Sequence, residues 1–393
     1  MTIRTTSVLF LLFALIGNWA CAQNIDFGKN NYIEYQHGNF PLIISVAHGG
    51  TTEPSSIPDR ACNDPVYAVD AFTIETALEI KKSIYAKTGC YPHIIISHLK
   101  RNKLDPNRNE LDGACGNQEA IVAWQEFHDF IAKARRTANQ EYNYNTFFVD
   151  LHGHSNPIER VELGYLLYDD ELQFSDNILN TEEYINYSSI KRLANGNFNN
   201  YTHTELLKGP DAFGTLLSHR NFPAVPSQSI PFPGTNTNYF SGGYITAYHT
   251  SYNPDAPING LQMELNFNNI RNTATNRTKF AAAFADATIE YMKTHFNLNW
   301  NSCKPLSTIN SQPTPQFSVY PNPVCRGDFI YFNLTEDITY EYMIFNLQGQ
   351  LSAKGILNSE TSLNSEQFNT GFYFINIFNE LNGTYITKKI IIY

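Results

Sequence analysis

The sequence is poor in charged residues and contains no long run of Lys or Arg. Only 16% of its 393 residues are charged, and Asp and Glu outnumber Lys and Arg by 37 to 27. Nucleic-acid-binding proteins normally carry a basic face, so no nucleic-acid partner is expected. Hydrophobic residues make up 42%, which is enough for a sizeable core and argues against wholesale disorder.

Long hydrophobic runs are also scarce. The run at residues 8–16 follows a short basic N-terminus and precedes small residues around Cys21. A transmembrane helix needs about 20 apolar residues, so the pattern predicts a cleaved signal peptide at residues 1–22 and no stable membrane span. Acylation of Cys21, as in a lipoprotein, is the alternative, but Asn18 stands where an aliphatic residue would be expected. We therefore expect a secreted or cell-surface product.

Cysteine occurs six times and never in a Cys-x-x-Cys pair, so a thiolate zinc site is not expected. Export permits disulfides. Four cysteines of the central region could form two bridges in three possible connectivities: Cys62, Cys90, Cys115 and Cys303. Cys325 is left over from this set.

Residues 23–303 read as one α/β domain. Apolar strand-like segments alternate with segments of helical periodicity. The strand-like segments are residues 41–47, 91–97, 146–151 and 260–265, and the helical ones are residues 66–88, 119–136 and 278–296. This alternation predicts a mostly parallel or mixed sheet flanked by helices.

The composition changes at residues 304–316, where three prolines stand among Ser, Thr, Asn and Gln, as in a linker. Beyond it, residues 317–393 contain short alternating runs separated by turn residues. That pattern predicts a small antiparallel β-sandwich.

Four short motifs mark this C-terminal region. They are Tyr-Pro-Asn-Pro at 320–323, Ile-Phe-Asn-Leu-Gln-Gly at 344–349, Gly-Phe-Tyr-Phe-Ile at 371–375 and Lys-Lys-Ile-Ile-Ile at 388–392. In this order they resemble the type IX secretion C-terminal sorting domain of Bacteroidetes. The resemblance implies recognition by the secretion machinery, passage through the outer membrane and removal of the tail. A carbohydrate-binding or adhesive β-module is the alternative.

Polar residues follow three of the strand-like segments. His48 is followed by two glycines, which let backbone and ligand approach closely. The segment from Arg101 to Arg108 supplies guanidinium donors suited to carboxylates and oxyanions. His152 stands two residues after Asp150, a pattern in which a neutral imidazole binds a metal and a carboxylate orients it.

Each cluster also has a purely structural interpretation. His48 could be hydrogen-bonded within its own loop, the arginines could pair with Asp105, and Asp150 with His152 could be a structural pair. The clusters gain weight together, because ligand sites in open α/β sheets gather at the carboxyl ends of strands.

Five stretches in order resemble the N-formylglutamate amidohydrolase family, whose fold is similar to that of zinc carboxypeptidases. These stretches are residues 45–50, 101–108, 148–153, 242–246 and 261–266. The resemblance implies a zinc ion bound by His48 and His152.

The third zinc ligand should be a carboxylate. Zinc carboxypeptidases use His-x-x-Glu, but Thr51 stands three residues after His48. Asp70 occupies a position that looks like the family's Asp and is our choice, and Glu53 is the alternative.

The resemblance also implies the substrate contacts. Arg108 with Asn107 would hold a substrate carboxylate, and Arg101 would polarise the scissile carbonyl or share that contact. Gly243 and Tyr244 would belong to a substrate loop, although Tyr244 could equally be a packing residue.

Glu264 is the expected general base and then acid, because an ionised side chain after an apolar strand needs a partner or a function. Its alternative is a buried ion pair with an arginine. We therefore expect a zinc-dependent amidohydrolase that cleaves an amide or N-acyl bond of a small-molecule or peptide substrate bearing a carboxylate. A non-catalytic surface protein that binds carboxylated ligands is the alternative, and a surface adhesin is a third possibility.

Overall fold

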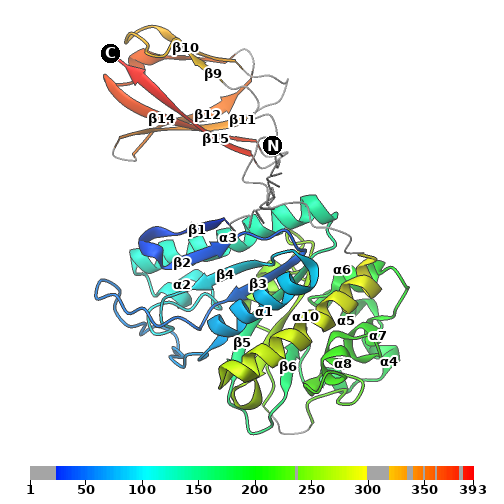
Figure 1. The fold of residues 1–393 in the computed structure, drawn as a ribbon. Helices are drawn as coiled ribbons and strands as arrows, with labels where there is room; N and C mark the ends of the chain where they lie inside the picture. Colours follow the sequence, from blue (N-terminus) through cyan, green and yellow to red (C-terminus); the bar gives the residue numbers. More distant parts are fainter. Residues whose placement is uncertain are drawn as a thin grey trace, which may run out of the picture. The chain divides into compact units, whose positions relative to one another are not determined.

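The computed structural model describes residues 24–234, 238–298, 318–333, 340–347, 350–358, 361–379 and 384–393. The expected signal peptide and the linker at residues 304–316 lie outside the described residues. The chain divides into two compact units, and the boundary between them falls between residues 306 and 307 (Figure 1).

The first unit is built on a mixed sheet of eight strands in the order β1-β2-β4-β3-β5-β8-β6-β7. The four central strands, β4, β3, β5 and β8, run parallel, and β2 and β6 pair antiparallel at either side of them. The strands are β1 (Ile25–Phe27), β2 (Ile33–Gln36), β3 (Leu42–Val46), β4 (His93–Ser97), β5 (Phe147–His154), β6 (Val161–Gly164), β7 (Ala224–Val225) and β8 (Asn259–Asn266). The predicted α/β class with a mixed sheet flanked by helices is confirmed.

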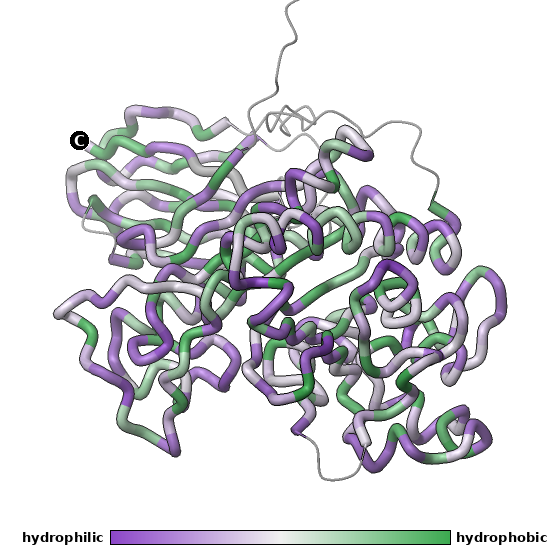
Figure 2. The backbone as a smooth tube through the Cα atoms, turned by 60° about the horizontal axis from the view of Figure 1, so that its bottom comes forward, coloured by the Kyte–Doolittle hydropathy of each residue, from purple (hydrophilic) through white to green (hydrophobic). Residues whose placement is uncertain are grey.

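Helices cover both faces of this sheet. On one face α1 (Thr73–Thr88) and α10 (Ala274–Phe296) pack side by side, and on the other face α3 (Gln118–Tyr142) packs against β2, β3 and β4 (Figure 1). Alternate residues of β5 serve the two sides: Val149 joins the hydrophobic core with α1 and α10, and Phe148 joins the core with α3. Strand β3 is apolar at every position except Ser45, and hydrophobic stretches of this kind run through the interior of the first unit (Figure 2).

Helix α1 begins at Thr73, seven residues later than the start predicted at residue 66. The intervening residues form a loop that carries Asp70, and Phe72 has the left-handed φ of 65° just before the helix. Shorter helices, most of them between β6 and β8, complete this unit: α2 (Glu110–Ala114), α4 (Asp176–Leu179), α5 (Glu182–Tyr187), α6 (Lys191–Gly196), α7 (His203–Lys208), α8 (Phe213–Ser218) and α9 (Tyr244–His249), with the single turns η1 (Lys29–Asn31), η2 (Glu171–Gln173) and η3 (Phe267–Arg271).

The second unit contains two antiparallel sheets, of order β13-β10-β9 and β12-β11-β14-β15. Side chains of both sheets, such as Ile330 and Ile344, share one hydrophobic core. Its elements are β9 (Ser318–Tyr320), β10 (Phe329–Asn333), β11 (Tyr340–Asn346), β12 (Leu351–Leu357), β13 (Ser362–Asn364), η4 (Ser365–Gln367), β14 (Gly371–Asn379) and β15 (Thr384–Ile392). Strands β12 and β13 were not predicted, because their residues lack a clear apolar alternation.

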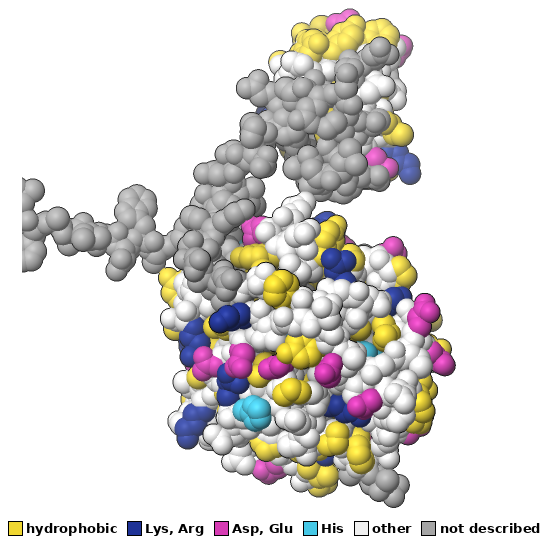
Figure 3. Space-filling view, turned by 90° about the vertical axis from the view of Figure 1, so that its right-hand side faces the viewer, with side chains coloured by type: hydrophobic (Ala, Val, Ile, Leu, Met, Phe, Trp, Pro, Cys, Tyr) yellow, Lys and Arg dark blue, Asp and Glu magenta, His cyan; other side chains and the backbone are white. Residues whose placement is uncertain are grey.

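Cys62 and Cys115 form a disulfide across 53 residues. Cys90 is also disulfide-bonded, Cys303 lies outside the described residues, and Cys325 is exposed and free. Among the described residues, no helix is both long and apolar enough to cross a membrane. On the face seen in Figure 3, basic and acidic side chains of the first unit are interspersed.

Candidate metal and catalytic site

The candidate site lies at the C-terminal ends of β3, β5 and β8. Strands β3 and β5 are neighbours in the sheet, and the next strand along the chain lies on opposite sides of this pair: β4 lies beside β3, and β8 lies beside β5. The strand order therefore reverses between β3 and β5. Such a switch point is where open α/β sheets usually bind ligands. His48 stands two residues after β3, His152 lies near the end of β5, and Glu264 lies in β8.

His48, Asp70 and His152 form a compact buried cluster. The Nδ1 atoms of the two imidazoles are 3.1 Å apart. Asp70 Oδ2 lies 3.1 Å from Nδ1 of His152 and 3.4 Å from Nδ1 of His48. All three residues are at most 6% exposed. The structure therefore brings together the three residues chosen from the sequence as metal ligands.

The backbone around the cluster holds these groups in place. The Asp70 N–H donates to the carbonyl of His48, and the Gly153 N–H donates to Asp70 Oδ2. Gly50 lets the loop after β3 pass against the end of β4, because a Cβ there would lie 2.3 Å from the carbonyl carbon of His98. A larger residue at Gly50 would force this loop away from the backbone of His98.

Each imidazole turns its second nitrogen toward an aspartate. His48 Nε2 lies 2.6 Å from Asp105 Oδ1, and His152 Nε2 lies 3.0 Å from Asp150 Oδ2. The Ser45 hydroxyl donates to the other oxygen of Asp150 at 2.7 Å. In the tautomer that carries its proton on Nε2, directed at these carboxylates, each histidine would present an Nδ1 lone pair to the cluster.

Charge interactions dominate protonation in this cluster. Burial lowers the pKa of His152, but the carboxylates of Asp150 and Asp70 raise it by more, so the pKa lies well above its ordinary value. Burial raises the pKa of Asp70, yet hydrogen bonds with His152 and His48 bring it well below its usual range. Asp70 is thus an anion that faces two imidazoles.

Glu264 lies beside His152, because the two residues are register partners in the parallel strands β8 and β5. Gln262 Nε2 donates to Glu264 Oε1 at 2.9 Å. Burial raises the pKa of Glu264 to about 8. Among the described residues no arginine forms an ion pair with Glu264, in contrast to the alternative considered from the sequence.

The arginines predicted to bind substrate contact Asp105 instead. Asp105 Oδ2 lies 3.0 Å from Nε of Arg101 and 3.6 Å from Nε of Arg108. The two terminal nitrogens of Arg108 donate to the carbonyls of Asn63 and Asp64. The structural interpretation, in which both arginines pair with Asp105, therefore describes the observed contacts.

Asn107 connects this loop to helix α9. Its Oδ1 accepts from the Ile245 N–H, and its Nδ2 lies 3.4 Å from His152 Nε2. Gly243 packs directly on Asn107, since a Cβ there would lie 2.5 Å from the amide atoms. Tyr244 opens α9 and packs between Trp124 and Tyr248, as in the packing interpretation.

Glu53 lies away from the cluster. Its carboxylate is 43% exposed and pairs with Lys100 at 2.8 Å. Sequence reasoning missed Arg60 and Glu162, both buried beside the site. Glu162 is the register partner of Glu264 in β6, and the short Val-Glu-Leu-Gly strand around it gave no recognisable signal.

Comparison with known proteins identifies the second unit. The family model described as a secretion system C-terminal sorting domain matches residues 318–393. The C-terminal unit is a type IX secretion sorting domain. It directs the chain to the secretion machinery and indicates secretion and a cell-surface location.

No curated protein matches the chain. One matching solved structure is described as PorZ, an essential bacterial surface component of the type IX secretion system of Porphyromonas gingivalis. It is 16% identical to this chain with a TM-score of 0.17, over 20% of this chain and 11% of that chain.

Proposed function

We propose that the chain is a secreted zinc-dependent amidohydrolase that cleaves an amide or N-acyl bond of a carboxylate-bearing amino acid or peptide. The observation that carries the proposal is the spacing of the His48, Asp70 and His152 ligand atoms, 3.1–3.4 Å apart. Ligands held tetrahedrally at 2.0–2.2 Å from zinc stand about 3.3 Å from one another.

The donor set also fits a cation. Two Nδ1 lone pairs and an anionic carboxylate oxygen repel one another at this distance unless a proton or a cation lies between them. Two histidines and one carboxylate are the ligands of several catalytic zinc sites, which leave a coordination position open. Asp105 and Asp150 would supply the carboxylates that commonly orient such histidines.

A zinc ion in such a site lowers the pKa of water and polarises a carbonyl group. Glu264 would accept the proton of the attacking water and pass it to the leaving nitrogen. Gln262 fixes one of its carboxylate oxygens. The pKa near 8 would fall when a cation is bound nearby, because positive charge favours the ionised carboxylate that can accept a proton.

On the substrate side, Arg101 is better placed than Arg108. Arg101 uses Nε for Asp105 and Nη1 for the carbonyl of Ala68, and its Nη2 has no hydrogen-bond partner among the described residues. Its side chain is 17% exposed. We therefore assign the contact with a substrate carboxylate or carbonyl to Arg101, with Asn107 beside it.

We include in this proposal the resemblance to the N-formylglutamate amidohydrolase family and a fold similar to that of zinc carboxypeptidases. A mixed sheet with the cluster at the C-terminal ends of its strands is compatible with that family and with that fold. The substrate is expected to be extracellular, because the sorting domain directs export.

The experiment is a screen of the mature, zinc-loaded chain against N-acyl amino acids and peptides, with Glu264→Gln as the matched variant. We expect hydrolysis by the wild type, and loss of at least about 100-fold in kcat with zinc retained in the variant. A variant of undiminished activity would refute Glu264 as the base. If the chain binds zinc and a carboxylated ligand but hydrolyses none of the compounds in the screen, the result would favour the non-catalytic binding protein.

A further inference from the structure

A pocket of about 440 Å³ lies along helix α9 and the segment that follows it. Three tyrosines line this aromatic pocket at four-residue spacing: Tyr244, Tyr248 and Tyr252. The rings of Tyr244 and Tyr248 stack with their centroids 5.5 Å apart, and Tyr248 and Tyr252 are 44% and 43% exposed. Clustered exposed aromatic side chains are typical of binding surfaces, because each ring buries a large apolar area on contact.

A second pocket, of about 430 Å³, adjoins the first, because Asn253 and Pro254 line both. This basic pocket is lined by the cations Lys191 and Arg192 of helix α6. Neither cation forms an ion pair with a described residue. The guanidinium of Arg192 lies over the ring of Tyr144, 5.1 Å from its centroid, which restricts its movement. We call the aromatic and the basic pocket together the α9 pockets.

The aromatic pocket begins beside the candidate catalytic site. Tyr244 follows Gly243, which packs directly on the side-chain amide of Asn107. Asn107 Nδ2 in turn lies 3.4 Å from Nε2 of His152. The pockets are therefore continuous with the site through one glycine and one asparagine.

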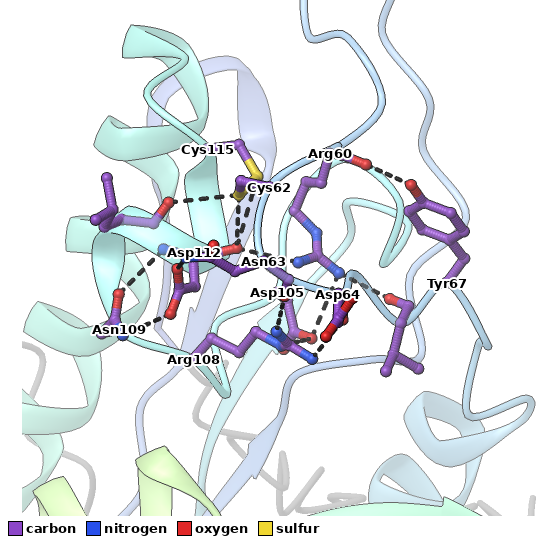
Figure 4. The surroundings of a disulfide bond; sticks show 12 residues. Arg60, Cys62, Asn63, Asp64, Tyr67, Asp105, Arg108, Asn109, Asp112 and Cys115 are labelled. Atoms are coloured by element: carbon purple, nitrogen blue, oxygen red, sulfur yellow. Dashed lines mark hydrogen bonds and ion pairs between the residues drawn. A yellow bond between two sulfur atoms is a disulfide. The ribbon is translucent and has the colours of Figure 1, made fainter.

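The chain on the other side of Asn107 is already engaged. Arg108 donates from its two terminal nitrogens to the carbonyls of Asn63 and Asp64, in a loop tied down by the disulfide of Cys62 (Figure 4). Of the two segments that adjoin Asn107, α9 is the one that offers exposed side chains beside a pocket. A substrate longer than one amino acid would therefore extend along α9.

We infer that the α9 pockets bind the distal part of an acidic peptide. The inference rests on the proposed function and narrows its substrate from a single acyl amino acid to a peptide. Lys191 and Arg192 attract carboxylates, and the tyrosines pack against the chain between them and the cleaved bond. Helix α9 has six residues, so it is about 9 Å long and matches about three residues of an extended peptide.

The first test measures binding directly, without catalysis. The affinity of the full mature chain for a fluorescein-labelled, Glu-rich hexapeptide and for its Gln-rich counterpart is measured by fluorescence anisotropy. Lys191→Gln/Arg192→Gln is compared with the control Lys279→Gln/Lys293→Gln, which removes two exposed charges from α10. We expect the wild type to prefer the acidic peptide, the first variant to bind it about 10-fold more weakly, and the control to match the wild type. Unchanged affinity in Lys191→Gln/Arg192→Gln would overturn the inference.

A second measurement locates the bound peptide without any variant. Nitration of exposed tyrosines by tetranitromethane is followed by mass spectrometry with and without the acidic peptide. We expect the peptide to slow nitration of Tyr248 and Tyr252 and to leave Tyr85 unchanged. Tyr85 is the matched control, because it is 42% exposed and stacks on Tyr91. Protection by a neutral oligosaccharide but not by the peptide would overturn the inference in favour of a glycan.

Hydrolysis separates this inference from the proposed function. We expect kcat/KM to be about 10-fold higher for acidic peptides than for single N-acyl amino acids, because distant contacts contribute binding energy to the transition state. A chain that hydrolyses both equally well overturns the inference and keeps the proposed function. A zinc-loaded chain that hydrolyses neither overturns the proposed function.

Discussion

Glu264 and His152 face the same side of the sheet as register partners in neighbouring parallel strands. In a parallel pair, partners point to the same face and their side chains lie close together. A carboxylate able to accept a proton thus stands beside an imidazole of the His48–Asp70–His152 cluster. This pairing places proton transfer next to the proposed metal.

The two carboxylates considered as third ligand can be separated by matched variants. Asp70→Asn removes the anion between the two imidazoles and should weaken zinc binding by on the order of 100-fold or more. Glu53→Gln removes only an exposed pair with Lys100 and should leave zinc binding unchanged. Chelator competition measures both. The reverse ranking would reassign the ligand to Glu53.

Arg101 and Arg108 should differ in their effect on substrate choice. In Arg101→Ala we expect the preference for a carboxylated substrate over its neutral amide analogue to disappear, because the unpaired Nη2 is lost. Arg108→Ala should keep that preference and lower the melting temperature, since its terminal nitrogens hold backbone carbonyls. The preference is measured as the ratio of kcat/KM for the two substrates. Loss of the preference in Arg108→Ala but not in Arg101→Ala would contradict the assignment of the substrate contact to Arg101.

The disulfide should stabilise the loop that carries Asp70. The double variant Cys62→Ser/Cys115→Ser opens a link across 53 residues. We expect the free energy of unfolding to fall by about 2–4 kcal/mol and zinc affinity to fall with it. Cys325→Ser, at an exposed free cysteine, is the control and should change neither. Chemical denaturation with and without zinc separates the two effects.

His93 should make the fold sensitive to acid. It is buried, and its Nδ1 accepts from the Tyr35 hydroxyl at 2.8 Å and from the Gly38 N–H at 3.1 Å. Burial lowers its pKa to about 3. The folded state therefore favours the neutral ring, so its contribution to stability is present above about pH 6.5 and is lost as the pH falls toward 3.

The loss due to His93 approaches about 1.4 kcal/mol per pH unit in that range. Denaturation of the metal-free chain at pH 7.5, 5.5 and 4.5 measures it, with chelator present so that zinc release does not contribute. His93→Gln should show a shallower pH dependence, and the exposed His219→Gln should follow the wild type. A His93→Gln curve as steep as the wild-type curve would show that another group controls acid sensitivity.

The gathering of His48, His152 and Glu264 could be predicted because each follows or ends a buried apolar strand. Parallel strands bring their carboxyl ends to one edge of the sheet, so residues at the ends of such strands are expected to gather there. Asp70 gave no such signal, since its loop has no periodicity, and it was chosen only from its position in a resembling family.

The role of Asp105 could not be read from the sequence. Its pairing with Arg101 is local, four residues away, but its contact with His48 spans 57 residues. Side-chain contacts of that kind depend on how loops pack rather than on a pattern along the chain. Strand β12 escaped prediction for a related reason, because Gly355 and Lys354 interrupt its apolar character.

Metal content of the full mature chain, purified without added metal, tests the central claim most directly. We predict about one zinc ion per chain, removed by a chelator, recovered on adding zinc, and absent from His48→Ala. A folded wild type that contains no metal and takes up none when zinc is added would contradict the account.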